Sequence, residues 1–324
     1  MWRALWQRTL AGAAVVLGVV TLTFLLLHLA PGDPATRLLG PRATADAVTA
    51  ERHALELDRP LGTQYAHWLA QFVVGHWGTS IATGRPVRDI LARAWPATVR
   101  LVGLSLLLSY LAGLLIGVVQ AARHGSWIDT GLSLASVTLA ALPGYWLGLM
   151  LVLGFSYHAR ALPAFGAAGL DWDLLRGWPR AVDELRHLVL PLVTLTLVGA
   201  GGAARYARGA LLDVAAQPFV LTARAKGLGP ARVWWRHALP NALGPVLTML
   251  GLSLPALFSG AVFVEAVFAW PGVGGVLVTA VESRDYPVVM AATAVSAVLV
   301  VTGNWLADVA AAWADPRLRE ASPA

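Results

Sequence analysis

The chain of 324 residues contains no cysteine, a single lysine and few charged side chains. Without cysteine it can form neither a disulfide nor a thiolate metal site. The one lysine, Lys226, is followed rather than preceded by glycine, which excludes the GxxxxGK[ST] phosphate-binding loop of nucleotide hydrolases. Only 13% of the residues are charged, whereas soluble domains contain about a quarter. A lipid bilayer is therefore the expected solvent.

The common metal and catalytic patterns are also missing from the sequence. The eight histidines include no HExxH motif and no pair at i and i+4 that would suit a metal ion. Ser259-Gly260 lacks the preceding glycine of a serine-nucleophile site. The net charge of +6 would suit nucleic acid, but the basic residues lie between apolar runs, where they orient helices in a membrane. We expect no metal, no cofactor and no nucleic acid.

Six apolar runs are long enough to cross about 30 Å of hydrocarbon, which takes about 20 helical residues. They are Thr9 to Leu29, Leu101 to Ala122, Thr130 to Tyr157, Leu188 to Ala204, Ala242 to Val264 and Val288 to Ala307. The first follows two arginines, as a secretory signal does, but it is too long for one and ends in Pro31-Gly32-Asp33-Pro34. The sequence therefore predicts an all-α membrane protein with six transmembrane helices.

Arginine in short loops predicts how these helices are oriented. Arg3 and Arg8 have no acid nearby, and the segment between the fourth and fifth runs carries six basic residues against Asp213 alone. Both regions, and with them the N- and C-termini, are expected to be cytoplasmic. The long segment after the first run would lie outside and fold as a small helical cap, with amphipathic helices around Ala45 to Leu57 and Thr63 to Gly75.

This topology divides the chain into four parts. We expect residues 1–30 to form the cytoplasmic N-terminus and first span, 31–97 the outer cap, 98–312 a core of five spans, and 313–324 a cytoplasmic C-terminal tail. The core includes a cytoplasmic loop at residues 208–240, where the pattern changes from apolar to basic and amphipathic.

Proline and glycine punctuate the part of this loop that we call the elbow, residues 217–240. Pro218 suits the first position of a helix, Gly227 suits a left-handed helix stop, and Gly229-Pro230 restarts a second helix. Small side chains such as Ala225 would let the groove of another protein accept the elbow. A basic interfacial helix held by anionic lipid is the alternative, and the two remain open on physical grounds.

The elbow resembles the cytoplasmic EAA loop of ABC importer permeases, in the form typical of dipeptide and oligopeptide permeases. The residues that carry the resemblance are Thr222, Ala223, Arg224, Ala225, Lys226, Gly227, His237, Leu239 and Pro240. Further matches are His28 to Pro34, Leu57 to Leu61, Gly78 to Ser80, Pro96 to Thr98, Leu188 to Pro191, Glu265, Phe268 to Gly272, Asp285 to Pro287 and Asp315 to Arg317. The chain departs from the general motif at Leu221, which replaces glutamate, and at His237, which replaces isoleucine.

The resemblance to this dipeptide/oligopeptide/nickel (DppB/OppB-like) family implies a type I ABC importer (MetI-like) permease core in a bacterial plasma membrane. It implies a second homologous permease as heterodimer partner, two cytoplasmic ABC ATPase subunits, an extracytoplasmic solute-binding protein and membrane lipid. In that family the elbow docks into a cleft of the ATPase, whose closure rocks the membrane helices. The chain would then be a transport subunit and not an enzyme. Its cargo would be a dipeptide, an oligopeptide or a related solute such as a nickel chelate or glutathione.

Glu265 and the prolines in the spans leave alternatives open. Glu265, at the outer end of the fifth run, either shapes a gate or pathway or simply marks the membrane interface. Pro143, Pro191, Pro245 and Pro255 would produce hinges or fixed bends. The alternative function, a secondary ion-coupled transporter, would need intramembrane carboxylates and matched broken helices, of which the spans offer little.

Overall fold

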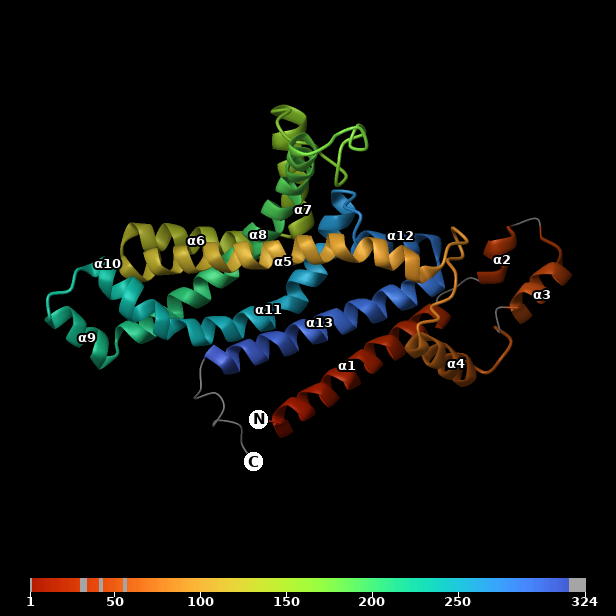
Figure 1. Ribbon diagram of the computed structural model, residues 1–324, viewed down its shortest axis with the longest axis horizontal. Coiled ribbons are helices and arrows are strands. Elements are labelled where there is room, and N and C mark those ends of the chain that lie inside the picture. The colour runs from red at the N-terminus through yellow and green to blue at the C-terminus, as the bar shows by residue number, and fades with distance from the viewer. Residues whose placement is uncertain (1, 30–33, 41–42, 55–56, 315–324) are drawn as a thin grey trace. The chain divides into compact units, whose positions relative to one another are not determined.

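The computed structural model describes residues 2–29, 34–40, 43–54 and 57–314. The matches at residues 30–33 and at Asp315 to Arg317, together with most of the C-terminal tail, lie outside this range. The regular secondary structure of the described residues is helical, apart from an isolated antiparallel bridge between Thr79 and Pro86. Figure 1 shows the helices in chain order.

The N-terminal helices are α1 (Trp2–Leu29), α2 (Pro34–Leu39), α3 (Ala45–Ala54) and α4 (Leu61–Val74). They are followed by α5 (Val87–Ala122), α6 (Trp127–Ala141), and α7 (Gly144–Leu151), which continues as a π-helical segment (Val152–His158). Next come α8 (Trp178–Ala215), α9 (Pro218–Ala225), and α10 (Pro230–Arg232), which leads through a π-helical turn (Val233–Ala238) into α11 (Leu239–Val267). The chain continues with α12 (Val273–Ser283) and α13 (Tyr286–Ala314).

Among the described residues, five helices or helix runs are long and apolar enough to cross a membrane, and a bent pair makes a sixth candidate. This agrees with the six runs expected from the sequence. The third run, however, is not one straight helix, because α6 and α7 meet at 102° (Figure 1). Leu142 is extended, with ψ 132°, as residues before proline usually are, and Pro143 cannot donate the hydrogen bond that would continue α6.

The two amphipathic helices expected in the outer segment correspond to α3 and α4. The C-terminal end expected for the first falls partly on residues 55 and 56, which lie outside the described range. Helix α4 ends at Gly75, whose φ of 90° allows its backbone N–H to reach the carbonyl groups of Gln71 and Phe72. Glycine is favoured here because this left-handed conformation costs other residues energy.

The described chain forms two compact units. Of the described residues, unit 1 comprises 2–6, 99–270 and 302–314, and unit 2 comprises those within 7–98 and 271–301. The four parts expected from the sequence were defined by membrane topology and not by compactness. The two units do not test them, and the four-part division stays a prediction.

Unit 1 is built on close contacts of α8 with α5 and α6. A Cβ atom added to Gly201 would lie 2.5 Å from the carbonyl oxygen of Ser136 on α6. One added to Gly113 of α5 would lie 2.5 Å from the Cβ atom of Ala203. Only glycine permits these approaches, so Gly113 and Gly201 act in helix packing.

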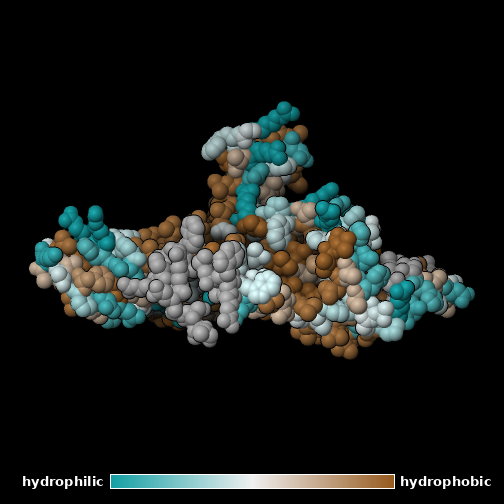
Figure 2. Space-filling view, turned by 60° about the horizontal axis from the view of Figure 1, so that its bottom comes forward, coloured by the Kyte–Doolittle hydropathy of each residue, from teal (hydrophilic) through white to brown (hydrophobic). Residues whose placement is uncertain are grey.

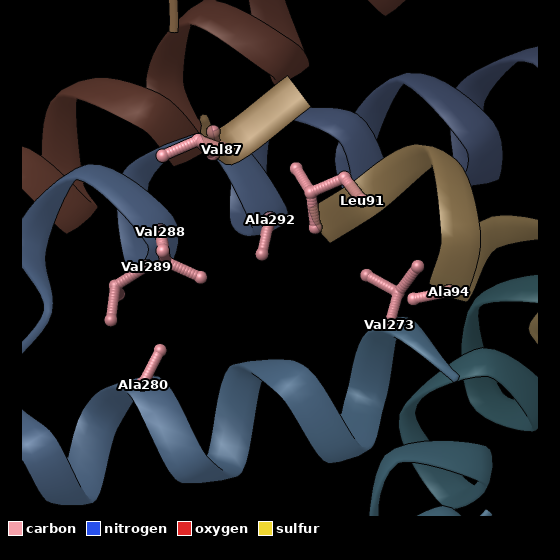
Figure 3. Packing of buried hydrophobic residues seen from close by; sticks show 9 residues of the cluster. Val87, Leu91, Ala94, Val273, Ala280, Val288, Val289 and Ala292 are labelled. Carbon is pink, nitrogen blue, oxygen red and sulfur yellow. The ribbon is translucent and has the colours of Figure 1, made fainter. Parts of the chain in front are cut away.

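The core of unit 2 lies between the first turns of α5 and the helices α12 and α13 (Figure 3). The figure shows Leu91 of α5 and Val273 of α12 pointing toward the same space as Ala292 of α13. All three are at most 2% exposed. The full cluster consists of Val87, Leu91, Ala94, Val273, Ala280, Val288, Val289, Ala291 and Ala292.

Candidate functional site

The elbow has the backbone that its sequence predicts. Helix α9 begins with Pro218 at its first turn and is capped by Lys226. Gly227 follows with φ 76°, and α10 restarts at Pro230. Because the π-helical turn after α10 runs directly into α11, the elbow is continuous with a long apolar helix.

Helix α9 and the π-helical turn that follows α10 share a small core of their own. Val220, Ala223 and Val233 are at most 5% exposed and pack together, with Leu228 against them. The backbone N–H of Leu228 donates to the carbonyl of Ala223 at 3.4 Å, which closes the turn. Ala223 thus serves the packing inside the elbow, where a larger side chain would push the helices apart.

The other predicted residues of α9 and its turn face outward. Thr222, Arg224, Ala225, Lys226 and Gly227 are all exposed. Of the later group, Pro240 is exposed, whereas His237 and Leu239 are half-buried. The sequence pattern placed these nine residues together without distinguishing those inside the elbow from those on its surface.

The exposed surface of α9 is apolar as well as basic. Phe219 is 44% exposed and Leu221 is 52% exposed, close in sequence to the exposed cations Arg224 and Lys226. Figure 2 shows hydrophilic side chains surrounding hydrophobic ones at the left end of unit 1, where α9 and α10 lie. Exposed apolar side chains rimmed by polar ones are typical of surfaces that bind another protein.

A buried ion pair lies near the elbow and was not found from the sequence. The guanidinium of Arg208, on α8, donates to both carboxylate oxygens of Asp129, on α6, at 2.7 and 2.8 Å. Asp129 is 3% exposed, and it also accepts from the backbone N–H of Gly125 at 3.0 Å. His124 Nδ1 lies 3.2 Å from the same carboxylate. We call this group, Asp129 with Arg208, His124 and Gly125, the Asp129 clamp.

Part of the Asp129 clamp has a local sequence signal. Ser126 precedes Asp129 by three residues, the spacing of a capping box, and its hydroxyl accepts from the N–H of Asp129 at 3.3 Å. Its ion-pair partner, Arg208, lies 79 residues away in sequence. The sequence predicted Arg208 only as one of several basic residues in a loop.

Glu265 is fully buried in unit 1 and belongs to the last turn of α11. The N–H of Trp270 donates to its backbone carbonyl at 2.8 Å, and Phe268 and Trp270 are also buried. Between them Ala269 has φ 47°, a left-handed backbone conformation just after the end of α11. The role of Glu265 in a gate or pathway stays a prediction.

In unit 2, Asp285 fastens the turn at residues 78–86 to the junction between α12 and α13. Its carboxylate accepts hydrogen bonds from the Ser80 hydroxyl and from the backbone N–H groups of Ile81 and Ala82, the latter two at 3.1 and 3.2 Å. Asp285 and Ser80 are 2% and 4% exposed. Two matched motifs, Gly78 to Ser80 and Asp285 to Pro287, therefore form one buried contact.

Replacing Asp285 by alanine is expected to lower the free energy of unfolding by about 2 kcal/mol, because the buried Ser80 hydroxyl and two partly buried backbone N–H groups lose their acceptor. Ser80→Ala removes one donor to this carboxylate and should cost less. Thermal unfolding followed by tryptophan fluorescence checks both changes. Equal melting temperatures for Asp285→Ala and the wild-type protein would show that this contact does not stabilise the fold.

The fold and these sites define a polytopic helical membrane protein that presents a basic and apolar elbow and lacks a phosphate-binding loop. The family described as "Binding-protein-dependent transport system inner membrane component" matches residues 113–320, and its N-terminal counterpart matches residues 1–102. The chain belongs to this family.

The chain is similar over nearly its full length to several curated permease proteins. It is 38% identical to the oligopeptide transport system permease protein AppB of Bacillus subtilis, over 96% of this chain and 98% of that protein. It is 38% identical to the probable D,D-dipeptide transport system permease protein DdpB of Escherichia coli, over 98% and 97%. The glutathione transport system permease protein GsiC of Salmonella choleraesuis is 36% identical over 97% of both chains.

A chain of the MetNI methionine ABC transporter, solved in inward-facing conformations, has a similar fold. The TM-score is 0.58 at 18% identity, over 71% of this chain and 98% of that one. With the family, this fold makes the protein an integral multi-pass membrane permease subunit of an ABC importer, for which a separate subunit hydrolyses ATP. The membership implies ATPase and solute-binding partners, and it gives no support to a secondary transporter.

Proposed function

We propose that this chain is one of two homologous permease subunits of a bacterial peptide importer. The cargo assignment rests on the relatives, which are named for oligopeptides, D,D-dipeptides and glutathione and match over nearly their whole length. All of these are peptides or peptide-like molecules. We therefore favour a short peptide over a metal chelate as the cargo.

We further propose that the elbow and both termini face the cytoplasm. The bias of arginine and lysine in short loops supports this orientation. The segment between the fourth and fifth spans carries Arg205, Arg208, Arg224, Lys226, Arg232 and Arg236 against the single acid Asp213. Residues 31–97 would then lie outside, where a solute-binding protein arrives.

In this proposal the exposed surface of α9 enters a cleft of the ATPase, with Thr222, Arg224, Ala225, Lys226 and Gly227 at the contact. The buried core around Ala223 keeps the elbow rigid, so that a movement of the ATPase is transmitted instead of absorbed. The motion passes into α11 through the continuous helix after α10. An element with two arrangements gives ATP binding an effect on a distant pathway.

The complete importer in this proposal contains this chain, a second permease, two ATPase subunits and an external solute-binding protein, all in a lipid bilayer. Small side chains on the spans allow helices of two permeases to approach closely, as is usual between membrane helices.

Reconstitution tests the proposal. This chain is co-purified with its partner permease, ATPase and solute-binding protein and placed in vesicles, and uptake of a labelled dipeptide is measured with and without ATP. We expect the subunits to co-elute and uptake to require ATP. An ATPase subunit with its phosphate-loop lysine replaced is the control. Peptide uptake driven by an ion gradient through this chain alone would overturn the proposal.

A further inference from the structure

Unit 1 contains a cavity of about 560 Å³ between α5, α8, α11 and the first residue of α7. Its volume lies within the range of small-molecule sites, about 300–1,000 Å³. Four glycines line it: Gly144 at the start of α7, Gly199 and Gly202 on α8, and Gly260 on α11. A Cβ atom added to Gly202 would meet no atom within 4 Å. The missing side chain at this position therefore leaves open space in the cavity.

Polar groups are few in this lining and are concentrated at one side chain. Arg205 is the only charged residue among the lining residues and is exposed. Among the described residues it forms no ion pair, whereas Arg208, one turn further along α8, is held by Asp129. The remaining polar lining groups are hydroxyls: Tyr206, which is 37% exposed, and Tyr110, whose hydroxyl lies 2.6 Å from Ser253 Oγ.

We propose that this cavity receives a peptide in transit and that Arg205 binds its free carboxylate. The inference rests on the proposed function, because it requires a peptide as cargo. A guanidinium forms two parallel hydrogen bonds with a carboxylate, and such charge-assisted bonds are stronger than neutral ones. Oligopeptides, dipeptides and glutathione all have a free carboxylate in common, whatever their side chains. One arginine could therefore serve cargo of varied sequence.

The hydroxyl groups and glycines of the cavity fit the same role. Tyr206 can donate a hydrogen bond to the carboxylate or to a peptide carbonyl. Gly202 provides room without selecting a side chain. An arginine at the end of an apolar run can also bind the phosphate of an anionic lipid, which offers the same oxyanion chemistry. The experiment separates these two sources.

Arg205→Gln is compared with the wild-type protein in the complete reconstituted importer, with unchanged partner subunits. Uptake is measured for a peptide with a free C-terminus and for a C-amidated peptide that the wild-type importer transports. We expect Arg205→Gln to lower uptake of the free-acid peptide about tenfold, because roughly one charge-assisted pair is lost. Uptake of the amidated peptide should change less than twofold.

The loss should be the same in vesicles of neutral phosphatidylcholine and in vesicles containing phosphatidylglycerol. A loss confined to the anionic vesicles, or an equal loss for both peptides, would assign Arg205 to lipid or to folding and overturn the inference. Wild-type uptake that does not depend on ATP would instead refute the proposed function. The two failures are therefore distinguishable.

A second variant tests the cavity without touching a charge. Gly202→Leu places a side chain in the open space, and we expect peptide uptake to fall at least about fivefold while the subunits still co-elute. The matched control is Gly209→Leu on the same helix, where an added Cβ also meets nothing within 4 Å but which does not line the cavity. Wild-type uptake by Gly202→Leu would exclude this cavity from the pathway.

Discussion

Ala225→Asp is expected to leave membrane insertion and folding intact but to reduce ATP-coupled transport at least about tenfold. Ala225 is exposed on α9, so the new carboxylate does not disturb the core formed by Val220, Ala223 and Val233. At a docked interface the same carboxylate would be buried without a partner, which costs several kcal/mol. A tenfold loss of transport requires only about 1.4 kcal/mol of this cost. Transport and ATP hydrolysis by the reconstituted importer are measured together.

Two further variants define what this result means. Leu221→Glu also adds a carboxylate to the exposed surface of α9, but it restores the residue of the general motif, so we expect transport to continue. Ala223→Asp places a charge in the buried core and should unfold the elbow as well as uncouple it. Wild-type transport by Ala225→Asp would count strongly against ATPase docking at this surface.

The second large effect is expected at the Asp129 clamp. Asp129→Asn removes the charge that holds Arg208 and should lower the free energy of unfolding by about 3 kcal/mol, because the guanidinium loses its partner in a largely buried site. The side chain of Asp129 is 5% exposed and that of Arg208 is 27% exposed. The measurement is thermal unfolding in detergent, followed by the fluorescence of the 14 tryptophans.

His124→Ala is the control for the Asp129 clamp. The His124 side chain is 61% exposed and touches the same carboxylate, so its loss should cost less than about 1 kcal/mol. Arg208→Gln combined with Asp129→Asn should cost clearly less than the sum of the two single changes, since both remove one interaction. Additive effects would show that the two side chains stabilise the protein independently.

The elbow illustrates how far local sequence can be taken. Pro218 determines where α9 begins, because the proline ring fixes its φ angle. Gly227 determines where the chain turns, because a residue without a Cβ atom can adopt a positive φ. The inward position of Ala223 depends instead on Val233, which reaches it only after the turn has formed. The residues of the elbow can be found in the sequence, but only the folded chain separates its core from its surface.

The third span shows a similar limit. Its length and hydropathy indicated one span of 28 residues from Thr130 to Tyr157, and Pro143 was expected to give either a hinge or a fixed bend. In the structure α6 and α7 are separate helices at 102°. A proline can be seen in the sequence, but the angle at which the chain continues depends on what α7 packs against.

What the sequence determined by itself was the membrane as solvent, the approximate positions of six apolar spans, the elbow and the family resemblance. These follow from hydropathy, from proline and glycine geometry, and from motifs read along neighbouring residues. Only the tertiary structure paired Asp129 with Arg208 and Ser80 with Asp285, residues 79 and 205 positions apart, and formed the cavity beside Arg205. Hydropathy and backbone preference are properties of adjacent residues, whereas an ion pair or a cavity exists only when distant helices meet.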